Sequence, residues 1–246
     1  MPKQFVVLLA CIVSFYSCST LKTYTSLDSA LQNPNAVDRL KISYQNLHSL
    51  PPEIGKLKNL KELILFRDNI DSLPNEIGSL TSLEKISVTS CRLAKIPSEI
   101  GKLSKLRILY LQNNQLSFLP DSIGNLSSLK ELNVTSNFLD SIPPSIGQLQ
   151  NLEYLFLTGN NLKTLPPSIG NLHKLHALHI ADNDFLTLPD EIGNLDALFE
   201  LDVVHAGALL SLPESMCKLH NLETLYYDPT VSIPGCMISR MYLRPR

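Results

Sequence analysis

The stretch LPPSIGNLHKLHALHIADNDF runs from Leu165 to Phe185, and LPPEIGKLKNLKELILFRDNI, from Leu50 to Ile70, has almost the same pattern. A Leu or Ile followed by Pro recurs along the chain, with the Leu or Ile at Leu50, Leu73, Ile96, Leu119, Ile142, Leu165, Leu188, Leu212 and Ile233. The step between these pairs is 23 residues six times, then 24, then 21. Repetition at such a period indicates a solenoid, in which each unit buries its apolar side chains against its neighbours.

The repeated unit reads LPxxIGxLxxLxxLxLxxNxL and is clearest at residues 119–141 and 142–164. This pattern contains LxxLxLxxNxL and resembles the leucine-rich repeat family, over residues 27 to about 235. The resemblance implies an α/β solenoid, a horseshoe with a parallel concave β-sheet and an irregular or short-helical convex side. Related patterns occur in bacterial leucine-rich repeat lipoproteins and in cytoplasmic Ras-linked scaffold proteins.

Each repeat position has a structural task. In Leu155-Phe156-Leu157 the leucines point inward and Phe156 outward, because strand side chains alternate between faces. We expect a ladder of asparagines in the turn after the strand, with Asp68 and Cys91 in the same slot: Asn114, Asn137, Asn160 and Asn183. Cys91 is predicted to be a buried structural thiol rather than a nucleophile. Periodic glycines are expected to permit a tight convex turn: Gly55, Gly78, Gly101, Gly124, Gly147, Gly170 and Gly193.

The chain divides into five predicted segments. Residues 1–17 are a signal peptide, residues 18–26 a linker, and residues 27–49 an N-terminal capping repeat with a short helix at Leu27–Leu31 and the first strand at Leu40–Ile42. Seven repeats fill residues 50–211, and a partial repeat with a cap occupies residues 212–246, where the last strand is expected at Leu225–Tyr227. Cys217 and Cys236 fall near equivalent places in this cap, which predicts a disulfide in an oxidising compartment; otherwise both are small cap residues.

The N-terminus carries the apolar block FVVLLACIVSFYSC, from Phe5 to Cys18, after a short start with one lysine. This pattern is typical of a secretory signal and resembles a bacterial lipoprotein signal, which implies lipidation of Cys18. Leu8 to Cys11 matches the lipobox more closely but leaves a short apolar region before it. The alternatives are a plain cleaved signal and an uncleaved anchor.

Side chains that point outward from the strands form columns across the predicted concave face. Its middle carries aromatic rings among uncharged polar residues, which is the composition of a protein-interaction hot spot. The predicted partner-binding residues are Ile64, Phe66, Tyr110, Gln112, Asn133, Tyr154, Phe156, His179 and Asp202. The alternative is that these aromatics are only good strand formers.

Other function classes find little support in the sequence. A net charge of -2 without a dense Lys/Arg run argues against a nucleic-acid binder. Catalytic motifs such as GxSxG and HExxH are absent. His179, Asp182, Asp202 and His205 are interpreted as a solvated polar patch rather than a metal site. We therefore predict a non-enzymatic module without cofactors that binds a protein of unknown identity and touches a membrane only through a lipid anchor. The alternative is a cytoplasmic scaffold of the Ras-linked type.

Overall fold

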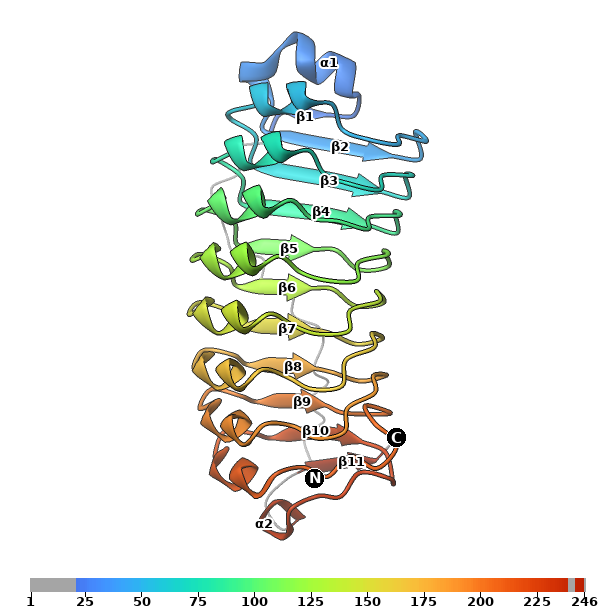
Figure 1. Ribbon diagram of the computed structural model, residues 1–246. Helices are drawn as coiled ribbons and strands as arrows, with labels where there is room; N and C mark the ends of the chain where they lie inside the picture. The colour runs from blue at the N-terminus through green and yellow to red at the C-terminus, as the bar shows by residue number, and fades with distance from the viewer. Residues whose placement is uncertain (1–20, 239–241, 246) are drawn as a thin grey trace, which may run out of the picture.

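The structure, a computed structural model, describes residues 21–238 and 242–245 and is an open stack of coils (Figure 1). Eleven parallel strands form one sheet whose spatial order is the chain order. They are β1 (Thr23–Tyr24), β2 (Arg39–Ser43), β3 (Glu62–Phe66), β4 (Lys85–Thr89), β5 (Ile108–Tyr110), β6 (Glu131–Asn133), β7 (Tyr154–Phe156), β8 (Ala177–His179), β9 (Glu200–Asp202), β10 (Thr224–Tyr227) and β11 (Tyr242–Pro245). The predicted leucine-rich repeat solenoid with a parallel sheet is confirmed.

Short 3-10 helices lie opposite the sheet, one in each coil, and follow the proline of the repeat. Each begins after a proline in extended conformation, such as Pro120 with φ of -68°, since the ring restricts φ and removes a donor. Successive i to i+3 bonds then carry the chain back towards the sheet. They are η2 (Pro52–Lys56), η3 (Asn75–Ser79), η4 (Ser98–Lys102), η5 (Asp121–Asn125), η6 (Pro144–Gln148), η7 (Pro167–Asn171), η8 (Asp190–Asn194) and η9 (Glu214–Lys218).

The core is one continuous cluster of aliphatic side chains between the sheet and these 3-10 helices. Every apolar position of a repeat contributes to it, as residues 119–141 show with Leu119, Ile123, Leu126, Leu129, Leu132, Val134 and Leu139, all buried. Parallel pairing aligns these positions between coils, so that Leu132 pairs with Leu155 and Leu155 with Leu178. A coil taken alone has no apolar layer on either side, which is why the unit must be repeated.

The periodic glycines do not serve the tight turn that was expected, because none of the seven has a positive φ. A Cβ atom on Gly124 would lie 2.4 Å from the backbone oxygen of Ser145 in the next coil, and one on Gly170 would lie 2.4 Å from that of Glu191. Glycine is therefore required by the close approach of neighbouring 3-10 helices rather than by a tight turn.

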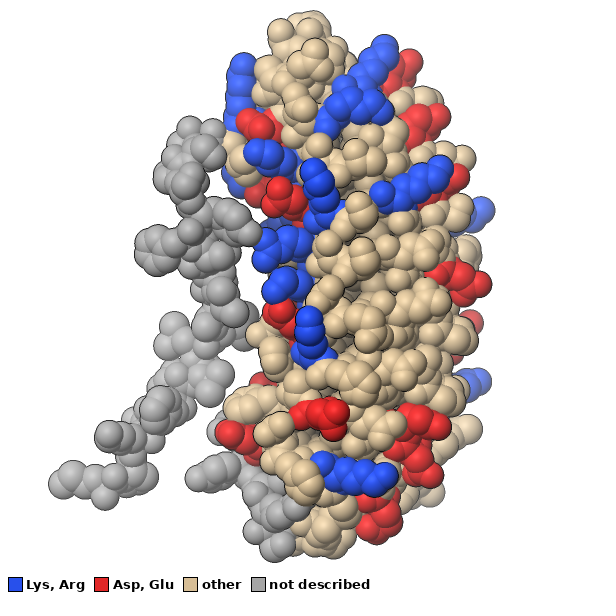
Figure 2. Space-filling view, turned by 90° about the vertical axis from the view of Figure 1, so that its left-hand side faces the viewer, with Lys and Arg blue, Asp and Glu red and all other residues tan. Residues whose placement is uncertain are grey.

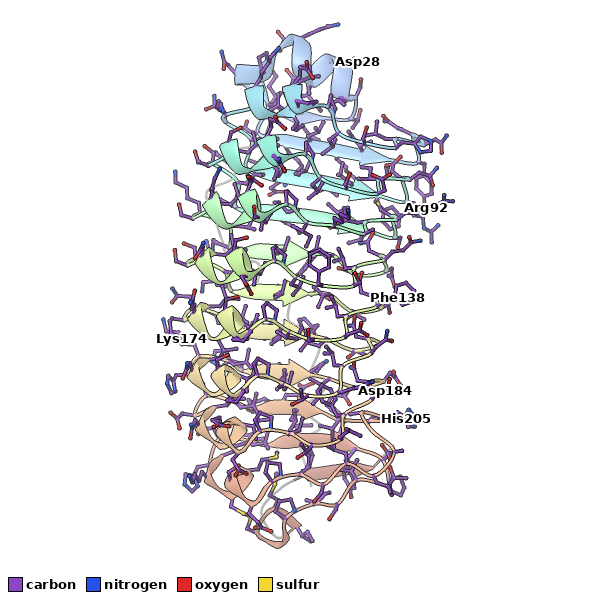
Figure 3. The ribbon with its side chains drawn as sticks, in the orientation of Figure 1. Asp28, Arg92, Phe138, Lys174, Asp184 and His205 are labelled. Atoms are coloured by element: carbon purple, nitrogen blue, oxygen red, sulfur yellow. A yellow bond between two sulfur atoms is a disulfide. The ribbon has the colours of Figure 1, made fainter. Side chains whose placement is uncertain are left out.

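The left-handed backbone conformation occurs instead just after each strand, at the edge of the sheet that Figure 3 marks with His205. Eight residues at 23-residue intervals have φ between 50° and 66°: Tyr44, Arg67, Ser90, Asn113, Ser136, Gly159, Asp182 and His205. Only one of them is a glycine. Asn, Asp, His and Gly favour this conformation, but Tyr44, Arg67, Ser90 and Ser136 do not, so at these four positions the surrounding hydrogen bonds hold the turn.

Both ends of the stack differ from the prediction. The helix α1 (Leu27–Gln32) is present, with Ser26 as its N-cap, and is followed by η1 (Pro34–Ala36). The sheet, however, begins earlier, because β1 lies in the predicted linker and pairs with β2. It also continues beyond β10, since the chain forms α2 (Gly235–Ile238) and then β11, which pairs with β10. The strands at Leu40–Ile42 and Leu225–Tyr227 are therefore not the outermost ones.

Candidate partner-binding face

The outward side chains of β2 to β10 form what we call the strand face. Register fixes its columns: Tyr110 lies beside Asn133, Asn133 beside Phe156, and Phe156 beside His179. A second column runs one strand position before the buried leucine and brings Tyr154 beside Ala177, and Ala177 beside Glu200. Parallel strands lie about 4.8 Å apart, so each side chain contacts those of the adjacent coils.

Eight of the nine predicted binding residues are half-buried on this face, and part of each side chain is accessible to solvent. The exception is Asp202, which is 9% exposed. Its Oδ1 accepts a hydrogen bond from the backbone N–H of Val204 at 3.1 Å. Asn133 makes the corresponding bond with Thr135 at 3.0 Å. Asp202 therefore shapes the turn after β9, as Asn133 shapes the turn after β6, and its role in binding stays a prediction.

Aromatic rings contact one another in the middle of the strand face, one pair edge to face and one pair tilted. The ring centroids of Phe156 and His179 are 5.0 Å apart with planes at 88°. Tyr154 and His176 are 6.0 Å apart at 59°. Such contacts hold the rings in place before any partner arrives, which lowers the entropy lost on binding. His176 stands directly before β8, against Tyr154.

Cationic side chains cover the aromatic rings near the N-terminal end of the strand face. Lys85 Nζ lies 5.3 Å from the centroid of the Tyr110 ring, and the Arg67 guanidinium lies 5.2 Å from that of Phe66. Tyr44 adds an edge-on contact to Phe66 at 5.7 Å. The sequence reasoning missed Lys85, Arg67 and Tyr44, although the 23-residue step places Lys85 in the column of Tyr154.

The C-terminal end of the face is acidic, and its histidines are paired with carboxylates. His179 Nε2 lies 2.9 Å from Glu200 Oε1, and His205 Nδ1 lies 3.3 Å from Asp182 Oδ1. The four residues that the sequence analysis grouped as a polar patch therefore do not form one cluster. His205 pairs with Asp182, whereas His179 pairs with Glu200. Among the described residues, one group of three potential metal ligands comes together, namely Glu214, Cys217 and Cys236.

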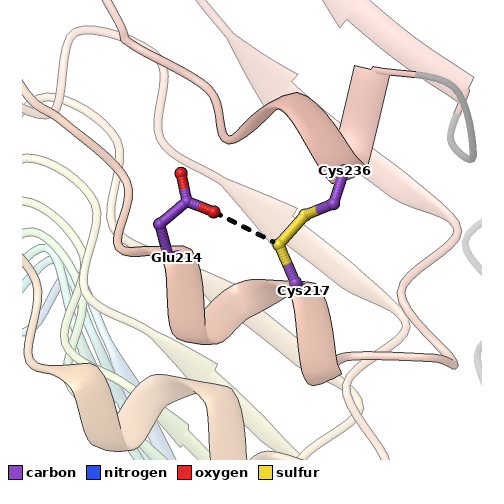
Figure 4. Close-up of side chains that lie close together, drawn as sticks. All are labelled: Glu214, Cys217 and Cys236. Atoms are coloured by element: carbon purple, nitrogen blue, oxygen red, sulfur yellow. Dashed lines mark hydrogen bonds between the residues drawn. A yellow bond between two sulfur atoms is a disulfide. The ribbon is translucent and has the colours of Figure 1, made fainter.

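That group is not built as a metal centre, because Cys217 and Cys236 form a disulfide (Figure 4). The bond joins η9 to α2 and so ties the last helix to the stack. Figure 4 also shows Glu214 beside it, with the carboxylate 3.6 Å from the Cys217 sulfur.

The asparagine ladder lies inside the turn that borders the strand face. Asn137 Nδ2 donates to the backbone oxygens of Leu111 and Val134, and its Oδ1 accepts from the N–H of Leu116 at 3.0 Å. Asn114, Asn160 and Asn183 repeat this arrangement. Cys91 occupies the same slot as a free thiol. Burial raises the pKa of the Cys91 thiol, which disfavours the reactive thiolate.

Charge also divides the side of the molecule where the chain enters the strands. Figure 2 shows Lys and Arg gathered over its upper part and Asp and Glu towards its lower end. Among the residues that directly precede a strand, Lys61, Arg107 and Lys130, before β3, β5 and β6, are basic, although Asp38, Glu84 and Glu153 also precede strands; before β10 this residue is Glu223.

The predicted signal and Cys18 lie outside the described residues. In the part of the chain that is described, no helix is both long enough and apolar enough to cross a membrane.

Comparison with known proteins gives one consistent result. A family model described as a leucine-rich repeat region matches residues 40–139 and 134–206. A leucine-rich repeat protein of Leptospira interrogans is 32% identical, over 91% of this chain and 69% of that one, with a TM-score of 0.61. None of the curated proteins matches the chain.

Two further solved structures extend this result. An internalin of Listeria monocytogenes is 19% identical over 82% of this chain and 57% of its own, with a TM-score of 0.68, and shows the fold alone. The ectodomain of a plant membrane receptor kinase from Arabidopsis thaliana was solved in complex with Casparian strip integrity factor 2. It is 25% identical over 85% of this chain and 29% of its own, with a TM-score of 0.61.

Proposed function

Because this chain belongs to the leucine-rich repeat family, whose fold generally serves protein–protein interaction, we propose that it binds a protein partner on its strand face. The observation that carries the proposal is the half-buried aromatic group Tyr110, Tyr154 and Phe156, flanked by cations at one end and carboxylates at the other. Preordered rings desolvate a large area at little entropic cost. The plant ectodomain, a similar repeat array, was solved in complex with Casparian strip integrity factor 2.

The experiment compares proteins captured from the source cells by the wild-type chain and by two double variants. Tyr110→Ala with Phe156→Ala removes the two rings from the strand face. Lys102→Ala with Gln148→Ala changes two exposed side chains on the 3-10 helices η4 and η6 and is the control. We expect each ring to contribute about 1 to 3 kcal/mol to binding. A partner lost from the ring variant and kept by the control supports the proposal, and a partner kept by both contradicts it.

We further propose that the chain acts in the cell envelope, anchored by a lipid on Cys18 or secreted. The apolar block at residues 5–18 and the disulfide between Cys217 and Cys236 both support an oxidising compartment outside the cytoplasm. Intact mass of the membrane-extracted protein tests this proposal. A chain that begins at Cys18 and carries acyl groups supports anchoring, whereas an unmodified soluble chain from Met1 favours the cytoplasmic scaffold instead.

A further inference from the structure

A cavity of about 430 Å³ opens where the chain enters strands β8 to β10, beside the strand face. Its lining residues are Tyr154, His176, Ala177, Ala197, Phe199, Glu200, Asn221 and Glu223. A cavity of this size falls in the range of pockets that hold small ligands or single side chains. Tyr154 belongs to the predicted binding residues, so the cavity is continuous with the strand face.

The residues that adjacent coils place at this position explain why the cavity forms. The backbone N–H of Phe199 donates to His176 O, and that of Glu223 donates to Phe199 O, so these three residues stand one above another in adjacent coils. In the neighbouring column the small Ala177 sits between Tyr154 and Glu200. A methyl group between two long side chains leaves a gap, and Ala197 widens it at the rim.

The lining combines aromatic surface with negative charge. Phe199 exposes 39% of its surface and so offers part of its ring to the cavity. Glu200 and Glu223 contribute two carboxylates, and none of the described lining residues is Lys or Arg. Glu200 shares its Oε1 with His179. The Glu223 carboxylate makes no hydrogen bond or ion pair with any described residue.

Resting on the function proposed above, we infer that this cavity binds the side chain of an arginine from the protein partner. A guanidinium is flat, so it stacks on the aromatic rings while its N–H groups donate to the carboxylates. At earlier coils the same column carries Lys61, Arg107 and Lys130, which would repel an arginine, interspersed with Glu84 and Glu153, whereas the described lining of the cavity has carboxylates and no cation. Charge complementarity therefore directs a basic part of the partner to the C-terminal coils.

Two small probes separate charge recognition from apolar packing. N-acetylarginine amide carries the guanidinium, and N-acetylcitrulline amide has nearly the same shape without the charge. Each is titrated into the disulfide-bonded protein while the amide resonances of Ala177, Ala197 and Asn221 are followed by NMR. We expect saturable shifts with the arginine probe and an affinity roughly fivefold higher than with citrulline. Equal affinities, or no saturable shift with arginine, would overturn the inference.

Two matched variants test whether the preference for arginine comes from this cavity. Glu223→Gln is expected to remove most of the preference for arginine over citrulline, whereas Glu84→Gln, at the equivalent position before β4, is expected to keep it. A Glu223→Gln protein that still prefers arginine fivefold would also overturn the inference. Neither result touches the proposal for the strand face, because Tyr110 and Phe156 do not line the cavity.

Discussion

At the first slot of the asparagine ladder the protein carries Asp68, and one of its oxygens is left without a partner. Asp68 Oδ1 accepts from the backbone N–H of Gln45 at 2.8 Å and of Leu47 at 3.2 Å. Its Oδ2 is buried and has no hydrogen-bond partner. In the later coils this second position is the Nδ2 of an asparagine, which donates to backbone oxygens. A carboxylate cannot donate there.

Asp68→Asn is therefore expected to stabilise the protein, by about 1 kcal/mol, because the new amide satisfies the carbonyls that the carboxylate cannot. Urea unfolding of the variant and the wild type measures the difference. Asn137→Asp, the reverse change in a complete ladder position, is the control and is expected to destabilise. A lower midpoint for Asp68→Asn would show that the aspartate is favoured by contacts other than the ladder.

A second buried carboxylate, Asp228, makes the end of the stack sensitive to acid. Burial opposes its ionisation, but hydrogen bonds from Thr230 and from the backbone N–H of His205 outweigh this effect and lower the pKa of Asp228 below its ordinary value of 3.8. A group with a lowered pKa contributes stability above pH 3.8, and that stability is lost as the pH falls through the folded-state pKa.

Asp228→Asn is expected to cost about 1 to 2 kcal/mol at pH 6 and to lose less further stability than wild type between pH 5 and pH 3. Thermal unfolding across this range gives the comparison. The exposed Asp184, which Figure 3 places at the edge of the stack, provides the control through Asp184→Asn. Parallel pH profiles for wild type and Asp228→Asn would contradict the assignment.

The 3-10 helices are the elements whose spacing depends most on single residues. A Cβ on Gly124 would lie 2.4 Å from Ser145 O, whereas a Cβ on Gly235 would meet nothing within 4 Å. Gly124→Ala is therefore expected to destabilise the protein by about 1 to 3 kcal/mol through overpacking. Gly235→Ala is expected to stay within about 0.5 kcal/mol of wild type. Equal midpoints in denaturant for the two variants would show that the coils can move apart at little cost.

The sequence predicted the repeated elements well because each one is specified many times. Leu132, Leu155 and Leu178 occupy one buried position in successive copies, and the shared spacing leaves a single register. The end strands were missed because they lack this support. Thr23–Tyr24 and Tyr242–Pro245 carry no LxL pattern, and they are strands through pairing with β2 and β10.

The candidate face was predictable in outline and less so in detail. Alternation in strands predicts that Phe156 points outward, and the structure places it there. Contacts between coils depend on side-chain conformations, which a periodic pattern does not specify. The pairing of His179 with Glu200 and the placement of Lys85 over Tyr110 are of this kind. The cavity beside Phe199 depends on the small side chain of Ala177, and no sequence motif marks this position.

At the scale of the whole molecule, the constant step predicts that a complete coil can be removed. Deleting residues 142–164 joins Ser141 to Leu165 and keeps every buried position in phase. We expect this variant to fold and to unfold cooperatively, with a melting temperature lower by several degrees, because stability in a solenoid is approximately a sum over neighbours. Deleting about half a coil, 142–153, breaks the phase and is expected to abolish the cooperative transition. Similar behaviour of the two deletions would contradict nearest-neighbour packing.

The response of the open stack to a pulling force depends on the direction of that force. Strands lie across its long axis, so the hydrogen bonds between neighbouring strands run along that axis (Figure 1). A pull on the two ends therefore loads the interfaces in series, so that the weakest one can open before the others. The protein is expected to unfold one coil after another under a pulling force that stays low and nearly constant. A tether at one end and a captured partner near the other would make it an extensible link rather than a rigid rod.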